Sequence, residues 1–432
     1  MIDDKSAHKR GVESWRKHIL MTTWIAYASF YLCRTNISIA IPGIMAEFAI
    51  TKTQMGGVLS SLFIAYAIGQ FINGQFADKF GARKMITIGI LLSAVMNIIF
   101  GFIGGILILM MVVWALNGYF QSMGWSSCVK TIANWFPLKR RGKTCGILGT
   151  SYQMGNVLSW LLGGFIIGNF GWRFGFWVPA LIFIAVGIFW YRKAKNAPEE
   201  VGLPTIEEEE RGIAAGDIRK DHHIGFKKTA KMTLLNPYIW AVGLGLLCLN
   251  IIRYGFLDWV PTYMFEVQKL SISTAAYKSL LLPFAGSLGA LSAGYISDKI
   301  FKSKRSPVIV LMLLLLVLFT WIYPQIPVGD WLSGILVLMA IGFMLYGPHV
   351  IMVTAMPMDY GTRKAAGSAT GFIDGMGYIG ASITGITSGW LIDTFGWSAA
   401  FDFWIAAAIA AAIIMILVWK FRKTENTNVC VE

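Results

Sequence analysis

Long apolar segments separated by short polar stretches run through this chain from near its start to near its end. A segment of about 20 apolar residues is long enough to cross the hydrocarbon core of a membrane as a helix. The pattern predicts twelve such helices, at residues 18–42, 54–76, 84–103, 106–131, 144–168, 173–191, 235–260, 275–297, 306–324, 331–356, 366–391 and 398–420. An even number of spans places both ends of the chain on the same side of the membrane.

The composition supports this interpretation. Hydrophobic residues make up 56% of the chain and charged residues 14%, and the mean hydropathy is +0.61. Soluble globular domains carry more charge. Because backbone N–H and C=O groups must find partners inside the chain when lipid surrounds them, apolar spans are expected to be helical. We therefore expect an all-α membrane protein that lies in a lipid bilayer.

The positions of the basic residues predict the orientation. The formal net charge is +14, which alone would be compatible with a nucleic-acid partner. However, 31 of the 37 lysines and arginines fall on the side of the termini and alternate loops, and only four fall on the other side. This positive-inside pattern predicts two cytoplasmic termini and accounts for the charge without nucleic acid. The first span lacks a cleavage signal, so we expect it to be retained.

The sequence contains no signature of metal, cofactor or enzyme chemistry. Its five cysteines show neither a disulfide framework nor metal-ligand spacing. We find no Gly-rich phosphate loop followed by Lys-Ser/Thr and no catalytic triad. We therefore expect no metal, no cofactor, no catalytic residues and no ATP-driven pump.

Three landmarks occur twice along the chain. Arg34 precedes Pro42 by eight residues, as Arg253 precedes Pro261. The other two repeats are Gly74, Asp78 and Lys79 with Gly294, Asp298 and Lys299, and Phe170-Gly171-Trp172 with Phe395-Gly396-Trp397. Such repeats predict two six-helix bundles, residues 1–191 and 235–432, related by a pseudo-two-fold axis along the membrane normal. The polar residues 192–234 would form a cytoplasmic linker, and a site would lie between the bundles.

The loop after the second span carries a recognisable motif, Gly74-Gln-Phe-Ala-Asp78-Lys79-Phe-Gly81-Ala-Arg83-Lys84. It resembles the cytoplasmic signature of the major facilitator superfamily, which implies the twelve-helix major facilitator fold. A carboxylate at a helix end among basic neighbours can lock one bundle to the other through charge-assisted hydrogen bonds. The gating residues expected from this loop and its copy are Asp78, Lys79, Arg83, Asp298 and Lys299.

Three further segments narrow the resemblance: Tyr31-Leu-Cys-Arg34-Thr-Asn36, Gly118-Tyr-Phe-Gln-Ser-Met-Gly-Trp125 and Arg253-Tyr-Gly-Phe-Leu-Asp258-Trp259-Val-Pro261-Thr-Tyr263. They resemble the organophosphate:phosphate antiporter family, which includes glycerol-3-phosphate, hexose-phosphate and phosphoglycerate transporters and sugar-phosphate sensors. The resemblance implies a bacterial-type inner membrane. It also implies that the arginines at the positions of Arg34 and Arg253 bind phosphate from opposite halves.

At the positions expected to determine substrate specificity, this chain differs from the family that it resembles. Many members carry a lysine where this chain has Thr35. Members similar to glycerol-3-phosphate transporters carry a lysine at the position of Gln70 and a histidine at that of Tyr152. The resemblance therefore implies a phosphate site inside a different specificity shell, with less positive charge.

Independently of the resemblance, the two arginines inside predicted spans indicate a functional site. An arginine inside a membrane span costs at least a few kcal/mol, and its planar fork matches two phosphate oxygens. Helical spacing places Tyr27, Tyr31 and Ser38 on the face of Arg34. Asn250 and Leu257 share the face of Arg253, whereas Asp258 is expected to point elsewhere and to pair with a neighbouring helix.

Other polar residues on the helices are candidate cavity walls. Each could bind substrate or make an interhelical hydrogen bond, and the sequence leaves both open. Asp374 could hold a proton, contact a sugar hydroxyl or balance an arginine, and His349 could respond to pH. The substrate-binding candidates are Arg34, Arg253, Tyr31, Gln121, Tyr152, Asp374, Tyr346, His349 and Gln70, and the further wall candidates are Asn117, Gly124, Cys128, Asn156 and Val353.

The function that follows is exchange of a phosphorylated metabolite for inorganic phosphate by alternating access, carried out by a monomer. Two alternatives stay open. One is a membrane sensor that binds a sugar phosphate and turns it over poorly. The other is a proton-coupled symporter of an organic anion that uses Asp374 or His349.

Overall fold

The computed structural model describes residues 2–204, 233–301, 305–357 and 366–428, and every element in these ranges is helical. The first half of the chain contains α1 (Ile2–Phe30), η1 (Tyr31–Cys33), α2 (Asn36–Phe48), α3 (Lys52–Phe80), α4 (Ala82–Phe102), α5 (Leu107–Gln121), α6 (Met123–Trp135), α7 (Leu138–Phe170), α8 (Phe174–Lys193) and η2 (Pro198–Val201). The second half contains α11 (Pro237–Glu266), α12 (Ile272–Ser279), α13 (Leu281–Lys299), α14 (Arg305–Ile322), η3 (Tyr323–Gln325), α15 (Trp331–Val350), the π-helical turn η4 (Ile351–Ala355), α17 (Ala366–Phe395) and α18 (Trp397–Asn428).

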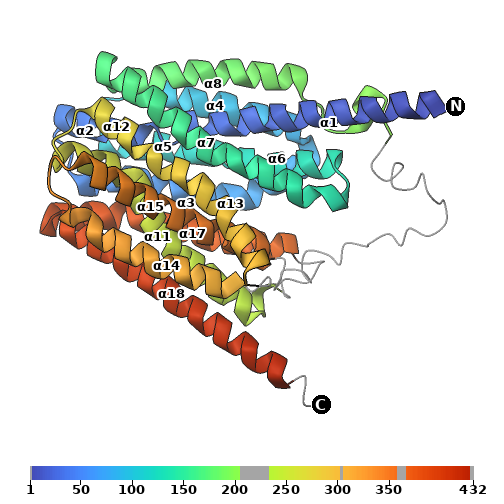
Figure 1. Cartoon of the computed structure of the whole chain (residues 1–432). Helices are drawn as coiled ribbons and strands as arrows, with labels where there is room; N and C mark the ends of the chain where they lie inside the picture. Colours follow the sequence, from blue (N-terminus) through green and yellow to red (C-terminus); the bar gives the residue numbers. More distant parts are fainter. Residues whose placement is uncertain (1, 205–232, 302–304, 358–365, 429–432) are drawn as a thin grey trace.

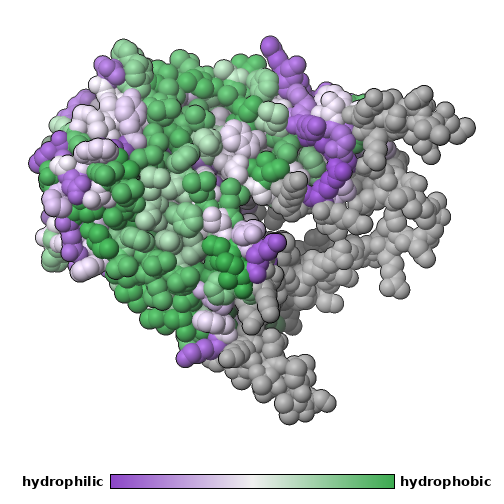
Figure 2. Space-filling view, viewed as in Figure 1, coloured by the Kyte–Doolittle hydropathy of each residue, from purple (hydrophilic) through white to green (hydrophobic). Residues whose placement is uncertain are grey.

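These elements match the twelve predicted spans one to one. Within the described ranges, eight helical segments are long and apolar enough to cross a membrane. The other four predicted spans correspond to α1–η1–α2, α3, α7 and α17. A broad hydrophobic zone separates hydrophilic zones at the two ends of the molecule (Figure 2), as expected for a surface that lies in lipid.

The repeated Phe-Gly-Trp motif ends a helix in each half. Gly171 follows α7 with φ of 91°, and Gly396 follows α17 with φ of 84°. Glycine adopts this left-handed backbone without the steric cost that a Cβ atom brings. The tryptophans that follow also behave alike, because Trp172 Nε1 donates to Glu47 and Trp397 Nε1 donates to Glu266. The sequence repeat therefore corresponds to a structural repeat.

The two halves contact each other at one end and diverge toward the end that carries the chain termini (Figure 1). We call these the closed end and the terminal end. At the closed end α3 packs along α17, with Ser60 Oγ donating to Ser382 O over 2.6 Å. A second contact joins α7 to α12, where Ser273 Oγ donates to Gly164 O over 2.9 Å.

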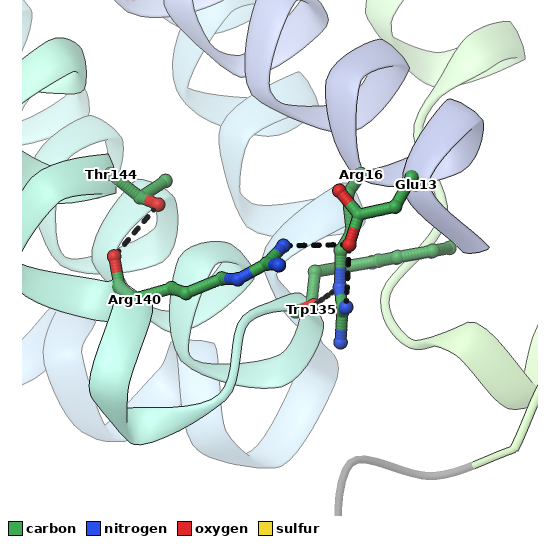
Figure 3. A network of polar contacts seen from close by, with 5 residues as sticks. All are labelled: Glu13, Arg16, Trp135, Arg140 and Thr144. Atoms are coloured by element: carbon green, nitrogen blue, oxygen red, sulfur yellow. Dashed lines mark hydrogen bonds and ion pairs between the residues drawn. The ribbon is translucent and has the colours of Figure 1, made fainter. Parts of the chain in front are cut away.

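A polar network fixes the start of α1 at the terminal end (Figure 3). Arg16 is 3% exposed and donates to Trp135 O over 2.8 Å. Glu13 accepts from Arg16 and, over 2.6 Å, from Arg140 on α7. Burial favours the neutral acid of Glu13, but the two guanidinium groups outweigh it and lower the pKa of this carboxyl. The network joins α1, α6 and α7 within one half, so it leaves the interface between the halves free.

Candidate functional site

The helix that carries the first arginine is interrupted where the arginine lies. α1 ends at Phe30, a 3₁₀ turn follows over Tyr31–Cys33, and α2 begins at Asn36. The interruption leaves carbonyls without their usual helical partners, which is tolerated inside a membrane only if other groups satisfy them. Gln121 Nε2 donates to Phe30 O over 3.1 Å, and Asn117 Nδ2 donates to Cys33 O over 2.9 Å. The amides of α5 therefore hold the break open at Arg34.

Neighbouring polar and aromatic groups orient the Arg34 side chain, which is 5% exposed. Its Nε donates to Gln121 Oε1 over 3.0 Å, and its Nη1 donates to the Tyr31 hydroxyl over 3.4 Å. Its Cζ lies 4.7 Å from the ring centroids of both Tyr31 and Tyr66. Its Nη2 is buried and has no hydrogen-bond partner among the described residues. Arg34 is thus fixed in position while one end of its fork stays available.

Arg253 reaches the same region from the other half of the chain. It lies on α11, which continues without a break through this position, and it is 4% exposed. Its Cζ lies 4.9 Å from the ring centroid of Tyr254 and 5.2 Å from that of Tyr346. Its Nε is buried and unpaired within the described ranges. Aromatic faces therefore stabilise this cation without neutralising it.

One cavity brings the two arginines together. Arg34 and Arg253 both line it, and the remaining walls come from η1, Thr35, α3, α5, α7 and α11. In the described part of the chain no carboxylate oxygen lies within 4.0 Å of either guanidinium. Buried charges are normally paired, because desolvation costs several kcal/mol per ion. Two unpaired guanidinium groups at one cavity are therefore the arrangement expected of a site that receives an anion.

A second cavity adjoins the first on the side of the terminal end. It shares Tyr31, Arg253 and Tyr254 with the first cavity. The predicted residues Tyr152, His349 and Asp374 also line it, and its other walls are Tyr27, Trp125, Asn250, Val353 and Tyr378. The structure thus gathers five of the nine predicted binding residues around Arg253: Tyr31, Tyr152, His349, Asp374 and Arg253 itself. The walls are mostly aromatic, with a few polar groups among them.

Three other predicted binding residues lie outside the linings of both cavities. Gln121 is fully buried and lines neither cavity, so its contact is with Arg34. Tyr346 also lies outside both linings and packs its ring against Arg253, with its hydroxyl unpaired among the described residues. Gln70 lines neither cavity, although its Nε2 is buried without a partner in the described ranges. A direct contact of Gln70 with ligand stays a prediction.

Asp258 lines the first cavity together with Arg253, but no ion pair joins the two among the described residues. The expected partner on a neighbouring helix is also missing for one oxygen, since Oδ2 is buried and unpaired in the part of the chain described here. Asp258 lies five residues after Arg253, so its side chain leaves α11 in a different direction. The cavity nevertheless extends around that side of the helix.

The sequence reasoning missed two aromatic residues, Tyr66 and Tyr254. Both rings lie within 5 Å of an arginine Cζ, at 4.7 Å for Tyr66 with Arg34 and 4.9 Å for Tyr254 with Arg253. The adjacency of Tyr254 to Arg253 was a usable signal. No local pattern could have found Tyr66, because it lies on α3 and meets Arg34 only through packing of the helices.

The predicted gating residues lie at the terminal end. Lys79 and Lys299 are exposed at the ends of α3 and α13. Arg83 donates from Nε to Tyr191 O over 2.8 Å, which is a contact inside its own half. The side chains of Asp78 and Asp298 lie outside the described residues, so a latch through them stays a prediction.

The chain is similar to known proteins over most of its length. The family model described as Major Facilitator Superfamily matches residues 23–385. The chain is 31% identical to the glycerol-3-phosphate transporter of Bacillus subtilis (strain 168), over 98% of this chain and 96% of the relative. It is 30% identical to a probable hexose phosphate transport protein of Chlamydia pneumoniae and to the membrane sensor protein UhpC of Escherichia coli (strain K12), each over 99% of this chain and 96% of the relative.

A solved structure shows the same fold. It is a bacterial homologue of the human lysosomal transporter Spinster, in an inward-facing and unoccupied conformation, with a TM-score of 0.75. The two chains are 15% identical, and the match covers 94% of this chain and 95% of the other. At this identity the likeness concerns the fold alone.

Proposed function

Because the chain belongs to the Major Facilitator Superfamily, we propose that it moves a phosphorylated metabolite across the membrane in exchange for inorganic phosphate. The observation that carries this proposal is a pair of buried guanidinium groups at a single cavity, one from each half, with no carboxylate partner among the described residues. A phosphoryl group offers oxygens to both forks at once, and it is common to the metabolite and to phosphate. The proposed substrate is a glycerol phosphate or a sugar phosphate.

The similar proteins support the substrate class. Two are named as transporters of hexose phosphate or glycerol-3-phosphate, and the match covers nearly all of each chain. The proposed phosphate counter-substrate rests on the arginine pair, because the names do not mention exchange. We also propose that a monomer suffices, since both arginines of the site come from one chain.

Electrostatics explains why exchange would be obligatory. Two cations a few ångströms from one anion each gain about 4 kcal/mol at an effective dielectric constant of about 20. Without an anion, the carrier would pass through a closed intermediate in which both buried guanidinium charges lack a counter-charge. The loaded carrier should therefore reorient more readily than the empty one, and each inward step with one anion would require an outward step with another.

The arrangement of the two halves fits the state of such a cycle in which the site opens to one side of the membrane. The halves are joined at the closed end and diverge at the terminal end (Figure 1). We propose that the terminal end is cytoplasmic, because most of the basic residues outside the spans belong to that side. The site would then open toward the cytoplasm of a bacterial-type inner membrane.

Reconstitution in liposomes tests the proposal. We expect vesicles loaded with unlabelled phosphate to accumulate labelled phosphate, and external glycerol-3-phosphate or a hexose phosphate to compete. Arg34→Lys and Arg253→Lys keep the charge but lose the fork, so exchange should fall at least about tenfold in each. The matched control is Arg192→Lys at the exposed end of α8, which should behave like the wild type. Near-normal exchange by either cavity variant would contradict the proposal.

A sensor is the second candidate, because the chain is as similar to a membrane sensor protein as to the transporters. A sensor would bind sugar phosphate tightly in detergent but exchange it slowly in the same liposomes. A proton-coupled symporter would instead lose its uptake on addition of an uncoupler and would need no internal phosphate. The proposed exchanger requires internal phosphate and is insensitive to the uncoupler.

A further inference from the structure

The cavity between the arginines also contains a buried carboxylate. Asp258 is 5% exposed and lines this cavity together with Arg34 and Arg253. Its Oδ2 has no hydrogen-bond partner among the described residues, and no ion pair joins it to either arginine there. An acidic side chain so close to an anion site is unexpected, because its ionised form would repel the same anion that the arginines attract.

A second unpaired acceptor lies in the same cavity. Asn156 on α7 is fully buried, and its Nδ2 donates to Tyr152 O over 3.1 Å. Its Oδ1 is left without a partner in the described ranges. The cavity therefore combines two unpaired donors, Arg34 Nη2 and Arg253 Nε, with two unpaired acceptors, Asp258 Oδ2 and Asn156 Oδ1.

The donors and acceptors together define the ligand that fits. Each buried group left without a partner costs about 1–3 kcal/mol. A fully deprotonated oxyanion offers acceptors only, so it would satisfy the arginines and leave Asp258 facing another negative oxygen. An anion that also carries an O–H group can satisfy the arginines with its oxygens and Asp258 with its proton.

No other charged residue lines this cavity in the described structure. The charged groups that face Asp258 are Arg34 from the α1–α2 break and Arg253 from its own helix, and the phenols are Tyr31 and Tyr254. The walls from α3 and α5 are apolar, namely Leu59, Leu62, Phe63 and Trp114. The free space beside them is about 10 Å³, enough for one group the size of a water molecule. A phosphoryl group is larger than this, so the cavity must widen when the anion binds, and the organic part of a substrate would extend into the adjoining cavity.

We propose that Asp258 is a specificity-determining residue that accepts a hydrogen bond from an O–H group of the bound anion. The site would thereby take phosphate and phosphate monoesters and reject sulfate, which has the same shape but no proton at neutral pH. This inference rests on the proposed binding of phosphate by Arg34 and Arg253. The O–H group has two possible sources, the acidic hydroxyl on phosphorus or an alcohol on the ester.

Competition against labelled phosphate in the full-length purified protein tests the assignment. In the wild type we expect phosphate to bind at least about tenfold more tightly than sulfate, because rejection of sulfate comes from an unpaired buried group. In Asp258→Asn the amide can donate to sulfate, so the preference should shrink to within about threefold. The control Asp330→Asn, at the exposed cap of α15, should keep the wild-type preference.

A second pair of probes separates the two sources. At alkaline pH both glycerol-3-phosphate and propyl phosphate are dianions, and only the former carries alcohols. A preference for glycerol-3-phosphate that disappears in Asp258→Asn identifies an alcohol as the donor. If the acidic hydroxyl on phosphorus is the donor, both dianions have lost it, so the two esters should bind equally and at least about tenfold more weakly than they do as monoanions at mildly acid pH.

The wild type alone can overturn the inference, so the test does not depend on folding of the variant. Equal binding of sulfate and phosphate by the wild type would refute the role of Asp258. An unchanged preference in a folded Asp258→Asn protein would refute it as well. If the wild type binds no phosphate at all, the proposed function fails first and this inference fails with it.

Discussion

The Asp393 carboxylate caps the first turn of a helix in the opposite half through Thr53. It accepts from the Thr53 backbone N–H and hydroxyl, both over 2.7 Å, and from the Lys52 N–H over 3.2 Å. The first N–H groups of a helix lack internal partners and carry partial positive charge, so an anion there is stabilising. Since Asp393 belongs to α17 and Thr53 to α3, this cap exists only while the closed end is closed.

Removing the cap should open the closed end. We expect Asp393→Ala to shift the equilibrium toward the state open at that end by about 1–2 kcal/mol, the size of a lost helix cap. Asp393→Asn keeps an acceptor but loses the charge, so its shift should be smaller. Labelling of single cysteines placed on the two sides of the site would measure the populations. Unchanged labelling in Asp393→Ala would contradict the cap as a latch.

The same cap predicts how the closed end depends on pH. Burial favours the neutral acid, but the hydrogen bonds from Thr53 and Lys52 outweigh it and lower the pKa of Asp393 below its usual value. A carboxyl with a lowered pKa stabilises the closed state above its ordinary range and loses that stabilisation as the pH falls through the lowered value. The labelling ratio should therefore be flat from neutral to mildly acid pH and change only below about pH 4. In Asp393→Asn the change below that pH should be absent.

The neighbouring ion pair should contribute less. Lys52 Nζ lies 3.2 Å from Glu266 Oε1, with side chains 17% and 30% exposed. Partly exposed pairs of this kind are worth about 0–1 kcal/mol and weaken with salt. Lys52→Met, which keeps the backbone N–H that Asp393 accepts, should therefore change the labelling ratio less than Asp393→Ala does. A larger effect of Lys52→Met would identify the ion pair, and not the cap, as the main contact.

Gly56 of α3 and Gly385 of α17 approach each other closely, so adding a Cβ atom tests whether this contact must form during the cycle. A Cβ atom on Gly56 of α3 would lie 2.2 Å from Gly385 O of α17, a separation that backbone atoms cannot accept. Gly56→Ala should therefore prevent full closure and slow exchange by at least about tenfold, because the cycle passes through this contact. The adjacent Gly57→Ala is the control, since its Cβ atom would meet only the flexible end of Met111 at 3.4 Å. Similar exchange by the two variants would argue against a close α3–α17 contact during the cycle.

Gln121 should act through Arg34, because it lines neither cavity. Gln121→Glu places a negative charge next to the guanidinium, so phosphate affinity should fall at least about tenfold as the internal carboxylate replaces the ligand. Gln121→Leu leaves Arg34 Nε and Phe30 O without this partner, and it should destabilise the fold by about 1–3 kcal/mol. Equilibrium binding and thermal unfolding separate the two effects. Normal phosphate binding by a folded Gln121→Glu protein would exclude this role.

The sequence by itself determined the architecture. Lipid requires helices of about 20 apolar residues, so hydropathy alone located the spans that the structure contains. The same physics singled out Arg34 and Arg253, because an ionised side chain inside a span is too costly to occur without a purpose. The repeated Phe-Gly-Trp motif predicted two related halves, and its two glycines have a similar positive φ.

Only the tertiary structure decided how the site is built. Helical periodicity gives the direction of a side chain around its own axis, but a cavity wall depends on how neighbouring helices are placed. That is why Asp258, expected to point away from Arg253, shares a cavity with it. It is also why Tyr66 was missed, and why Asp393 could not be matched with Thr53, which lies 340 residues earlier. Such contacts arise from packing between helices, and for Asp393 with Thr53 between the two halves, which no local pattern encodes.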